Sequence, residues 1–203
     1  ARAVAWDALV DHVARGHPVR SAHINHLIED VVREAAPLTA KPCLFVANVG
    51  DEGENSFSAD VESAARERGA EVIAIRGRLE AEIVEATATP EERSMFLAEF
   101  GLSETSLGRL VRAGYRLLHL VTFFTVEGPE VRAWTVREGT TAPQAGGRIH
   151  SDFADRFVLA EVMDLPLLIA AGSEKALRES GKTRRAGRDY AVRDGDVIHF
   201  ICS

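Results

Sequence analysis

The sequence predicts two fold classes in succession, an α/β region followed by an α+β region. Residues 42–47 and 71–75 are apolar runs with a helical pattern at about 58–68 between them, as in a βαβ unit whose parallel strands are buried on both faces. Runs rich in β-branched and aromatic residues at 121–126 and 131–136 flank a Gly-Pro turn, which predicts a β-hairpin. The strands and helices expected after the hairpin are typical of a β-grasp module.

The first residues predict a helical arm. Apolar spacing over residues 1–15 predicts a helix that ends at Gly16 and Pro18, and a second helix is expected at about 24–34. Because the chain starts at Ala1 and helical spacing begins at once, we expect a fragment or a processed chain.

The remaining elements follow from periodicity and from start and stop residues. Residues 140–147 are interpreted as a loop and Ser151 as a helix N-cap. Further helices are expected at about 79–85, 90–100, 103–118 and 165–171, and further strands at 157–162 and 197–202.

Composition restricts the function classes. A formal net charge of -7 argues against coating of DNA or of an anionic membrane, so any RNA contact must be local. Cys43 and Cys202 are the only cysteines, which fits buried thiols in a reducing cytoplasm rather than a disulfide framework. His23 and His26 have a spacing that could bind a metal, but no Cys or carboxylate pattern completes the set, so surface histidines are favoured. No apolar run spans a membrane and no secretion signal is present, so we expect a cytoplasmic protein.

The ends of the two parallel strands carry the candidate ligand-binding residues. In an open parallel sheet, ligands bind beyond the carboxyl ends of the strands. Asn48 can offer an amide, Asp51 a carboxylate, and Gly77 a close approach to the backbone. A turn with an Asx cap is the alternative interpretation of the same pattern. The candidate residues are Asn48, Val49, Asp51, Arg76, Gly77, Arg78 and Leu79.

A series of segments beyond residue 38 forms a recognisable pattern, and one of them is RAWTVREGTTAPQA at 132–145. The others are 38–42, 46–49, 79–83, 109–115, 123–125, 149–153 and 189–200. Taken in this order, the segments resemble the Obg-like P-loop ATPases of the YchF type, a family of the TRAFAC class. The first 35 residues resemble only the returning part of the family's helical insertion.

The resemblance implies three regions. Residues 1–37 would be the end of a helical, coiled-coil insertion, and 38–119 the base-recognition half of a P-loop nucleotide-binding domain. Residues 120–203 would be a TGS domain with the β-grasp fold. In the family the phosphate-binding loop and switch segments precede the insertion, and these 203 residues do not contain them. The triplet Gly181-Lys182-Thr183 does not replace them, because no buried strand leads into it and the required earlier glycine is Ala176.

The resemblance also implies cofactors and partners. The complete protein would bind ATP or GTP with Mg²⁺ and would contact the ribosome or ribosomal RNA through its TGS domain. These residues alone should not hydrolyse nucleotide, since the magnesium ligands lie in the missing segments.

Base preference depends on the residues after Asn48. The family has Asn-x-x-Glu where GTPases have Asn-Lys-x-Asp, and its members are held to prefer ATP. Asp51 restores the shorter carboxylate that suits guanine, yet Val49 lacks the lysine stem and Glu52 can compete. The resemblance favours ATP over GTP.

The densest basic stretch is the candidate RNA surface. It lies in an otherwise acidic chain, and a solvated helix-and-loop surface is the alternative. The candidate RNA-binding residues are Lys182, Arg184, Arg185 and Arg188.

Other polar and aromatic groups are interpreted as structural. Glu80, Glu82 and Glu85 lack a companion nucleophile and fit a solvated helix face. Trp134 and Phe124 could stack on bases, but alternating hairpin aromatics more often belong to the core.

Two functions therefore remain. One is part of a ribosome-associated ATPase that holds the base while residues elsewhere hold the phosphates. The other is a non-enzymatic adaptor whose TGS domain binds RNA or a protein partner and whose sheet is a scaffold.

Overall fold

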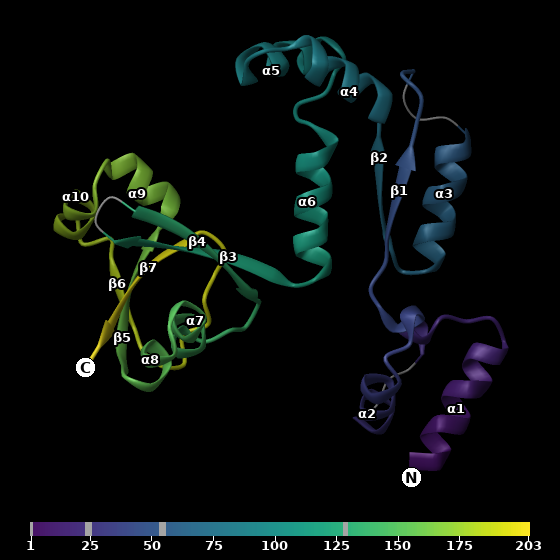
Figure 1. The fold of residues 1–203 in the computed structure, drawn as a ribbon, viewed down its shortest axis with the longest axis horizontal. Helices are drawn as coiled ribbons and strands as arrows, with labels where there is room; N and C mark the ends of the chain where they lie inside the picture. Colours follow the sequence, from purple (N-terminus) through teal and green to yellow (C-terminus); the bar gives the residue numbers. More distant parts are fainter. Residues whose placement is uncertain (1, 23–25, 53–55, 128–129) are drawn as a thin grey trace. The chain divides into compact units, whose positions relative to one another are not determined.

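The computed structural model describes residues 2–22, 26–52, 56–127 and 130–203. The chain forms two compact units, Ala1–Leu117 and Leu118–Ser203, whose elements are labelled in Figure 1.

The first unit begins with a pair of helices. Helix α1 spans Arg2–Ala14 and α2 spans His26–Ala35, and two short 3-10 turns follow them at Val19–Ser21 and Leu38–Ala40. Buried Leu9 and Val31 belong to one apolar cluster that holds this pair together. The predicted helical arm is therefore present.

A βαβ unit follows, as the sequence predicts. Strand β1 (Leu44–Asn48) pairs in parallel with β2 (Glu71–Ile75), and α3 (Ser56–Glu67) connects them. Within the described residues this sheet has two strands. The expectation that both faces are buried is wrong for β1, because the side chain of Val46 is 44% exposed.

Three helices complete the first unit. They are α4 (Gly77–Ala86), α5 (Pro90–Glu99) and α6 (Ser106–Leu117). Thr89 and Glu92 form a capping box that fixes the start of α5, with Pro90 in its first turn. Helices α3 and α6 both contact the two-stranded sheet, and Figure 1 shows α3 beside β1 and α6 beside β2.

The second unit is a five-stranded mixed sheet with helices. The strands are β3 (Leu120–Glu127), β4 (Glu130–Arg137), β5 (Phe157–Asp164), β6 (Arg184–Ala186) and β7 (Asp196–Cys202), in the order β4-β3-β7-β5-β6. Strand β3 runs parallel to β7, and the other pairs are antiparallel. The helices are α7 (Ala142–Ile149), α8 (Ser151–Asp155), α9 (Leu165–Ala171) and α10 (Glu174–Glu179). The predicted α+β class and hairpin are confirmed.

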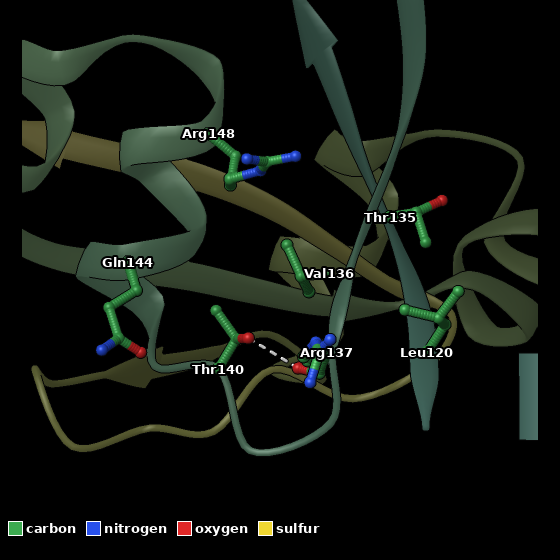
Figure 2. Close-up of a pocket in the computed structure, with 7 residues that line it drawn as sticks. All are labelled: Leu120, Thr135, Val136, Arg137, Thr140, Gln144 and Arg148. Carbon is green, nitrogen blue, oxygen red and sulfur yellow. Dashed lines mark hydrogen bonds between the residues drawn. The ribbon is translucent and has the colours of Figure 1, made fainter. Parts of the chain in front are cut away.

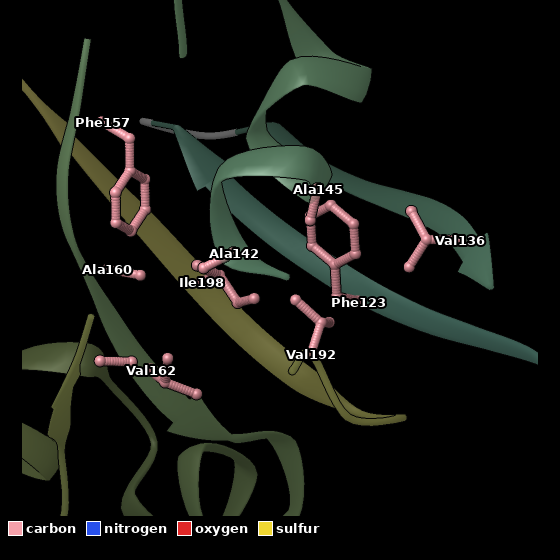
Figure 3. Packing of buried hydrophobic residues seen from close by; sticks show 10 residues of the cluster. Phe123, Val136, Ala142, Ala145, Phe157, Ala160, Val162, Val192 and Ile198 are labelled. Atoms are coloured by element: carbon pink, nitrogen blue, oxygen red, sulfur yellow. The ribbon is translucent and has the colours of Figure 1, made fainter. Parts of the chain in front are cut away.

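An apolar cluster covers each face of this sheet. On one face Phe123, Val162 and Ile198 pack with Ala142 and Ala145 of α7, and Figure 3 shows these side chains between the helix and the strands. Side chains of neighbouring positions point the other way, because they alternate along a strand. Met163 and Val197 accordingly belong to a separate cluster with Leu177 of α10 and residues of α9.

Most of the loop expected at residues 140–147 is instead helix α7, which begins at Ala142. Gln144 Oε1 accepts a hydrogen bond from the Thr141 backbone N–H at 3.0 Å, which satisfies a free donor at the helix start. Gly146 lies within the helix, and a Cβ at this position would come within 3.1 Å of Phe153 Cβ and 3.2 Å of Phe200 Cδ1. The glycine therefore permits close packing, whereas its occurrence in the sequence indicates a turn.

Two smaller expectations also differ from the structure. Ser151 is the first residue of α8, and its N-cap is His150, whose ring Nδ1 lies 3.3 Å from the Asp152 backbone N. Strand β6 was not expected. Its residues pair antiparallel with β5, from Ala160↔Ala186 to Val162↔Arg184.

Candidate functional site

The carboxyl ends of β1 and β2 are joined by a side chain. Asn48 Oδ1 accepts a hydrogen bond from the Gly77 backbone N–H at 3.2 Å, and the Val49 N–H donates to the Ile75 carbonyl at 2.8 Å. A Cβ at Gly77 would lie 3.1 Å from Asn48 Oδ1, so a larger residue would press on this contact. The two candidate segments therefore meet at one edge of the sheet.

A charged pair closes the same edge. Arg78 forms an ion pair with Asp51, and its Nε lies 3.9 Å from Glu82 Oε1. The pKa of Arg78 is raised above its usual value, first by the hydrogen bond to Asp51 and then by the charges of Asp51 and Glu82. Asp51 is thus directed at Arg78 in this structure, and both side chains remain exposed.

Two other candidate residues, Arg76 and Leu79, make contacts within the unit instead. Arg76 Nη1 donates to the Phe100 carbonyl at 3.1 Å. Leu79 is buried, and it packs with Ile83 and Leu97 in a small core between α4 and α5. The structure therefore brings Asn48, Asp51, Gly77 and Arg78 together, with Val49 half-buried beside them, and gives Arg76 and Leu79 contacts inside the unit.

Glu80 differs from the solvated residue that the sequence predicts. Its carboxylate accepts from the Ser106 backbone N–H at 2.6 Å and from the Ser106 hydroxyl, so it caps the start of α6. Arg109 extends this junction by donating to Ser106 Oγ at 3.0 Å and to the Ala74 carbonyl at 2.7 Å. Glu82 and Glu85 are exposed, as expected.

The candidate RNA residues in the second unit separate into two kinds. Arg184 Nη2 donates to the Tyr190 hydroxyl at 2.7 Å and its guanidinium lies 5.2 Å from the Tyr190 ring centroid. Arg188 Nη2 donates to the Phe157 carbonyl at 2.8 Å. Lys182 and Arg185 are exposed, and neither side chain has a partner among the described residues.

Arg184 belongs to a network around a buried carboxylate. Asp196 is 4% exposed and accepts from the Tyr190 hydroxyl at 2.7 Å and from the Arg193 backbone N–H at 2.9 Å. Burial, and then the hydrogen bond to Asp196, raises the pKa of Tyr190 to about 12. Tyr190 and Asp196 lie within the segment 189–200 that carries the family resemblance, but no sequence signal marks them as a pair.

The hairpin aromatics are packing residues in this structure. Trp134 packs against the cluster of Phe123 and its Nε1–H donates to Thr125 Oγ1 at 3.0 Å, while Phe124 packs on the opposite cluster. His23 lies outside the described residues. Among those residues, no cluster of His, Cys, Asp or Glu is arranged to hold a metal, and no helix is long and apolar enough to cross a membrane.

Comparison with known proteins gives consistent similarities. Residues 120–203 match the family model YchF-GTPase_C, which is described as a protein of unknown function. The chain is 42% identical over 188 residues to the ribosome-binding ATPase YchF of Bacillus subtilis (strain 168), covering 90% of this chain and 51% of that protein. It is also 42% identical over 172 residues to the protein of the same name from Escherichia coli O157:H7, covering 84% and 47%.

Solved structures show the same similarity. The YchF GTPase of Schizosaccharomyces pombe superimposes with a TM-score of 0.82 at 28% identity, over 97% of this chain and 54% of that one. A GTP binding protein from Pyrococcus horikoshii OT3 has a TM-score of 0.57 at 16% identity and supports the fold alone. The chain spans about half the length of these relatives.

Proposed function

Because this chain belongs to the YchF family, whose C-terminal portion it represents, we propose that it holds the base of a nucleotide and contacts the ribosome. The first unit would bind the base of ATP in preference to GTP. The second unit, taken as a TGS domain, would contact ribosomal RNA in the cytoplasm.

The junction between β1 and β2 carries the base-site proposal. Asn48 Oδ1 is engaged by Gly77, so its amide N–H groups remain as donors for an acceptor on a purine. Gly77 has no side chain to keep a flat ring away from the strand end. A planar base can therefore lie against this edge.

The Asp51–Arg78 pair supports a preference for adenine. Guanine is recognised by a carboxylate that accepts from its N1–H and its exocyclic amine. Here that carboxylate is already occupied by Arg78, which guanine would have to displace. Adenine presents one donor and one acceptor and does not require two acceptors at this position.

The residues present fit the base of the cofactor and not its phosphates. The 203 residues contain no glycine-rich strand–loop–helix segment that ends in Gly-Lys-Ser or Gly-Lys-Thr. Phosphate and Mg²⁺ contacts would come from the part of the family's nucleotide-binding domain that is not within these residues. The chain's own contribution is to select and orient the base.

Lys182 and Arg185 support the RNA contact. Both are exposed cations without an intramolecular partner in the described part of the chain, so neither must give up a contact to bind phosphate. Phosphate binding by such residues releases counterions and weakens as salt rises. Lys182→Ala with Arg185→Ala should lower ribosome co-sedimentation and its dependence on salt.

A matched variant serves as the control. Arg156→Ala with Arg193→Ala removes two exposed positive charges from the same unit but leaves Lys182 and Arg185 in place. Equal loss of ribosome binding in both double variants would show that only the total charge matters, and the assigned RNA surface would then be wrong.

The second candidate is a non-enzymatic adaptor. It is favoured by the ion pair that occupies Asp51. The coding sequence immediately upstream of Ala1 distinguishes the candidates, since only an ATPase requires a phosphate-binding loop there. A corresponding assay is whether MgATP changes ribosome affinity of a polypeptide that includes the upstream residues.

A further inference from the structure

Strand β4 lies at an edge of the sheet in the second unit, and one row of its backbone groups points away from the sheet. The Glu138 N–H donates to the His119 carbonyl at 2.7 Å, which makes these two residues a hydrogen-bonded pair that continues the β3–β4 ladder. Bonded pairs recur at every second residue, so Val131 and Ala133 lie at the alternate positions, whose N–H and C=O groups face outward. In the described strand order, β4 has β3 as its one neighbour.

This edge lacks two features that usually prevent pairing with a further strand. Its eight residues, Glu130–Arg137, include no proline, and their register with β3 is continuous, without a bulge in the described residues. The side chain of Val131 is 64% exposed, and Ala133 is also exposed. A long edge of this kind can serve as the template for another strand.

A pocket of about 440 Å³ adjoins the same edge beside α7. Three consecutive residues of β4, Thr135, Val136 and Arg137, line it, and because they point alternately to the two faces the pocket reaches the edge of the strand. Gln144 and Arg148 line it from α7, and Figure 2 shows Arg148 extending from that helix. Arg148 is exposed and has no hydrogen-bond or ion-pair partner among the described residues, so the pocket offers an uncompensated positive charge.

The other end of β4 carries a negative charge on the face that α7 covers. Trp134 and Val136 pack in the cluster beneath α7. Glu130 shares their face, because every second residue of a strand points the same way. Its Oε1 lies 2.9 Å from Arg132 Nε, and since both side chains are exposed this ion pair is weak and can be exchanged for another. The two ends of the strand are therefore complementary in charge.

We propose that two copies of this chain pair through β4, antiparallel about a two-fold axis at Ala133. The outward N–H and C=O groups of Ala133 and of the partner's Ala133 would exchange hydrogen bonds. Glu130 would lie opposite the partner's Val136, on the face that α7 covers, with its carboxylate in the pocket beside the partner's Arg148. Symmetry repeats this ion pair. The interface is independent of the function proposed above, because it uses neither the β1–β2 edge nor β6 at the opposite end of its sheet.

Charge selects this register over its two neighbours. Outward-facing residues must meet outward-facing residues, so the axis can move along the strand in steps of one residue. An axis at Arg132 would place this residue opposite the partner's Arg132, and an axis at Trp134 would place Glu130 opposite the partner's Glu138. Like charges directly opposite each other are destabilising. The axis at Ala133 avoids both and places Arg132 opposite the partner's Trp134, which suits a cation and an aromatic ring.

Analytical ultracentrifugation of the whole chain across a concentration series measures this self-association. One pair of strands buries little surface, so we expect a weak dimer that forms between about 10 µM and 1 mM. Ala133→Pro should abolish the dimer, because it removes the outward N–H at the axis and no bond to β3. Thermal melts check that each variant is folded.

The ion pair is tested by charge reversal and rescue. Glu130→Arg and Arg148→Glu should each weaken dimerisation at least about tenfold, because each places like charges together at two symmetric positions. The double variant, Glu130→Arg with Arg148→Glu, should recover most of the wild-type affinity. Arg156→Glu reverses another exposed arginine of this unit and is the matched control, which should dimerise as the wild type does.

Cysteine cross-linking tests the register in a Cys43→Ala, Cys202→Ala background, which removes both native thiols. Ala133→Cys should form a disulfide-linked dimer, because the Cα atoms of a hydrogen-bonded pair lie about 5.5 Å apart, within the disulfide range. Val131→Cys should cross-link poorly alone and readily when mixed with Thr135→Cys, its partner in this register. Equal cross-linking of Ala133→Cys and Val131→Cys alone would contradict the register.

Three other results would overturn the proposal. One is a chain that stays monomeric at about 1 mM, whatever other strand or peptide the edge accepts. Another is a dimer that persists in Ala133→Pro, which would place the interface elsewhere. The third is a charge-reversed double variant that dimerises as weakly as its single variants. None of these measurements involves nucleotide or ribosomes, so this proposal can fail while the proposed function stands.

Discussion

Arg184 and Arg185 are neighbours on β6, and we expect their alanine variants to affect different properties of the protein. Their side chains point to opposite faces of the strand. Arg184 donates to Tyr190 and lies near Asp196 at 3.5 Å, whereas Arg185 has no side-chain partner among the described residues. Arg184→Ala should therefore reduce stability, and Arg185→Ala should reduce RNA affinity.

The magnitudes follow from the contacts. Arg184→Ala removes a hydrogen bond worth about 1 kcal/mol and a cation–π contact worth about 0.5–1 kcal/mol. We assign little to the ion pair with Asp196, since the Arg184 side chain is half-exposed. The sum is about 1.5 kcal/mol, which lowers the urea midpoint by roughly 1 M. Arg185→Ala should change stability by less than about 0.5 kcal/mol.

Urea titration of the whole chain measures the first effect. Trp134 reports on the second unit in a Trp6→Phe background, because these are the only tryptophans. RNA affinity across a salt series measures the second effect, and Arg185→Ala should lower the salt slope by about 0.7. The reasoning is refuted if Arg184→Ala leaves the urea midpoint unchanged and lowers RNA affinity, or if Arg185→Ala unfolds the unit.

Three further predictions concern the proposed base site and the half-buried Tyr190. In a polypeptide that also carries the phosphate-binding half, Asp51→Glu should shift nucleotide preference toward ATP. Arg78→Ala should raise the tolerance of GTP, because it frees the Asp51 carboxylate. Unchanged ratios of GTP to ATP affinity in nucleotide titrations would remove Asp51 from the site. The 203 residues alone should not hydrolyse ATP and should bind it at about millimolar or weaker, since base contacts of about 1 kcal/mol each are all that remain. Calorimetry and a phosphate-release assay check this, and micromolar binding would reveal a phosphate site within these residues. Because the pKa of Tyr190 is about 12 in the folded unit and about 10 in an unfolded chain, its neutral form stabilises the fold below pH 10 and this stability is lost between about pH 10 and 12. The loss is at most about 3 kcal/mol, reduced by partial exposure of the tyrosine, and Tyr190→Phe should flatten the pH dependence of urea midpoints.

Much of the fold could be predicted because local signals agree with tertiary structure. The run ending at Asn48 is apolar and bounded by turn residues, and it forms β1. Thr89-Pro90 with Glu92 encodes a capping box that needs no distant partner. Such elements depend mainly on residues within one or two turns.

The elements that were missed depend on distant contacts. In the sequence, Gly146 indicates a turn. In the structure, Phe153 and Phe200 occupy the space that a Cβ at this position would need. Strand β6 consists of Arg184, Arg185 and Ala186, whose sequence has no strand signal, and pairing with β5 creates it. Both outcomes require partners that are distant in the sequence, which periodicity does not detect.

The sequence predicted that the two strand ends would meet, but it did not predict the contacts made there. The expectation that strand ends meet placed Asn48 beside Gly77. The sequence did not show that Asp51 would be paired with Arg78, because they are distant in the chain and the pairing requires both loops to be in place. Nor did it show that Arg184 would be engaged by Tyr190 and Asp196 rather than left for RNA.

The hydrogen bonds from Ser106 to Glu80 connect the start of α6 to the first turn of α4, next to the β1–β2 edge. Gly77 and Arg78 begin α4, and Glu80 in the same turn holds Ser106 at the start of α6. Arg109 ties the first turns of α6 to the Ala74 carbonyl of β2. If a base binds at the β1–β2 edge as proposed, any displacement of the start of α4 would be passed to the start of α6 directly, through the Glu80–Ser106 hydrogen bonds.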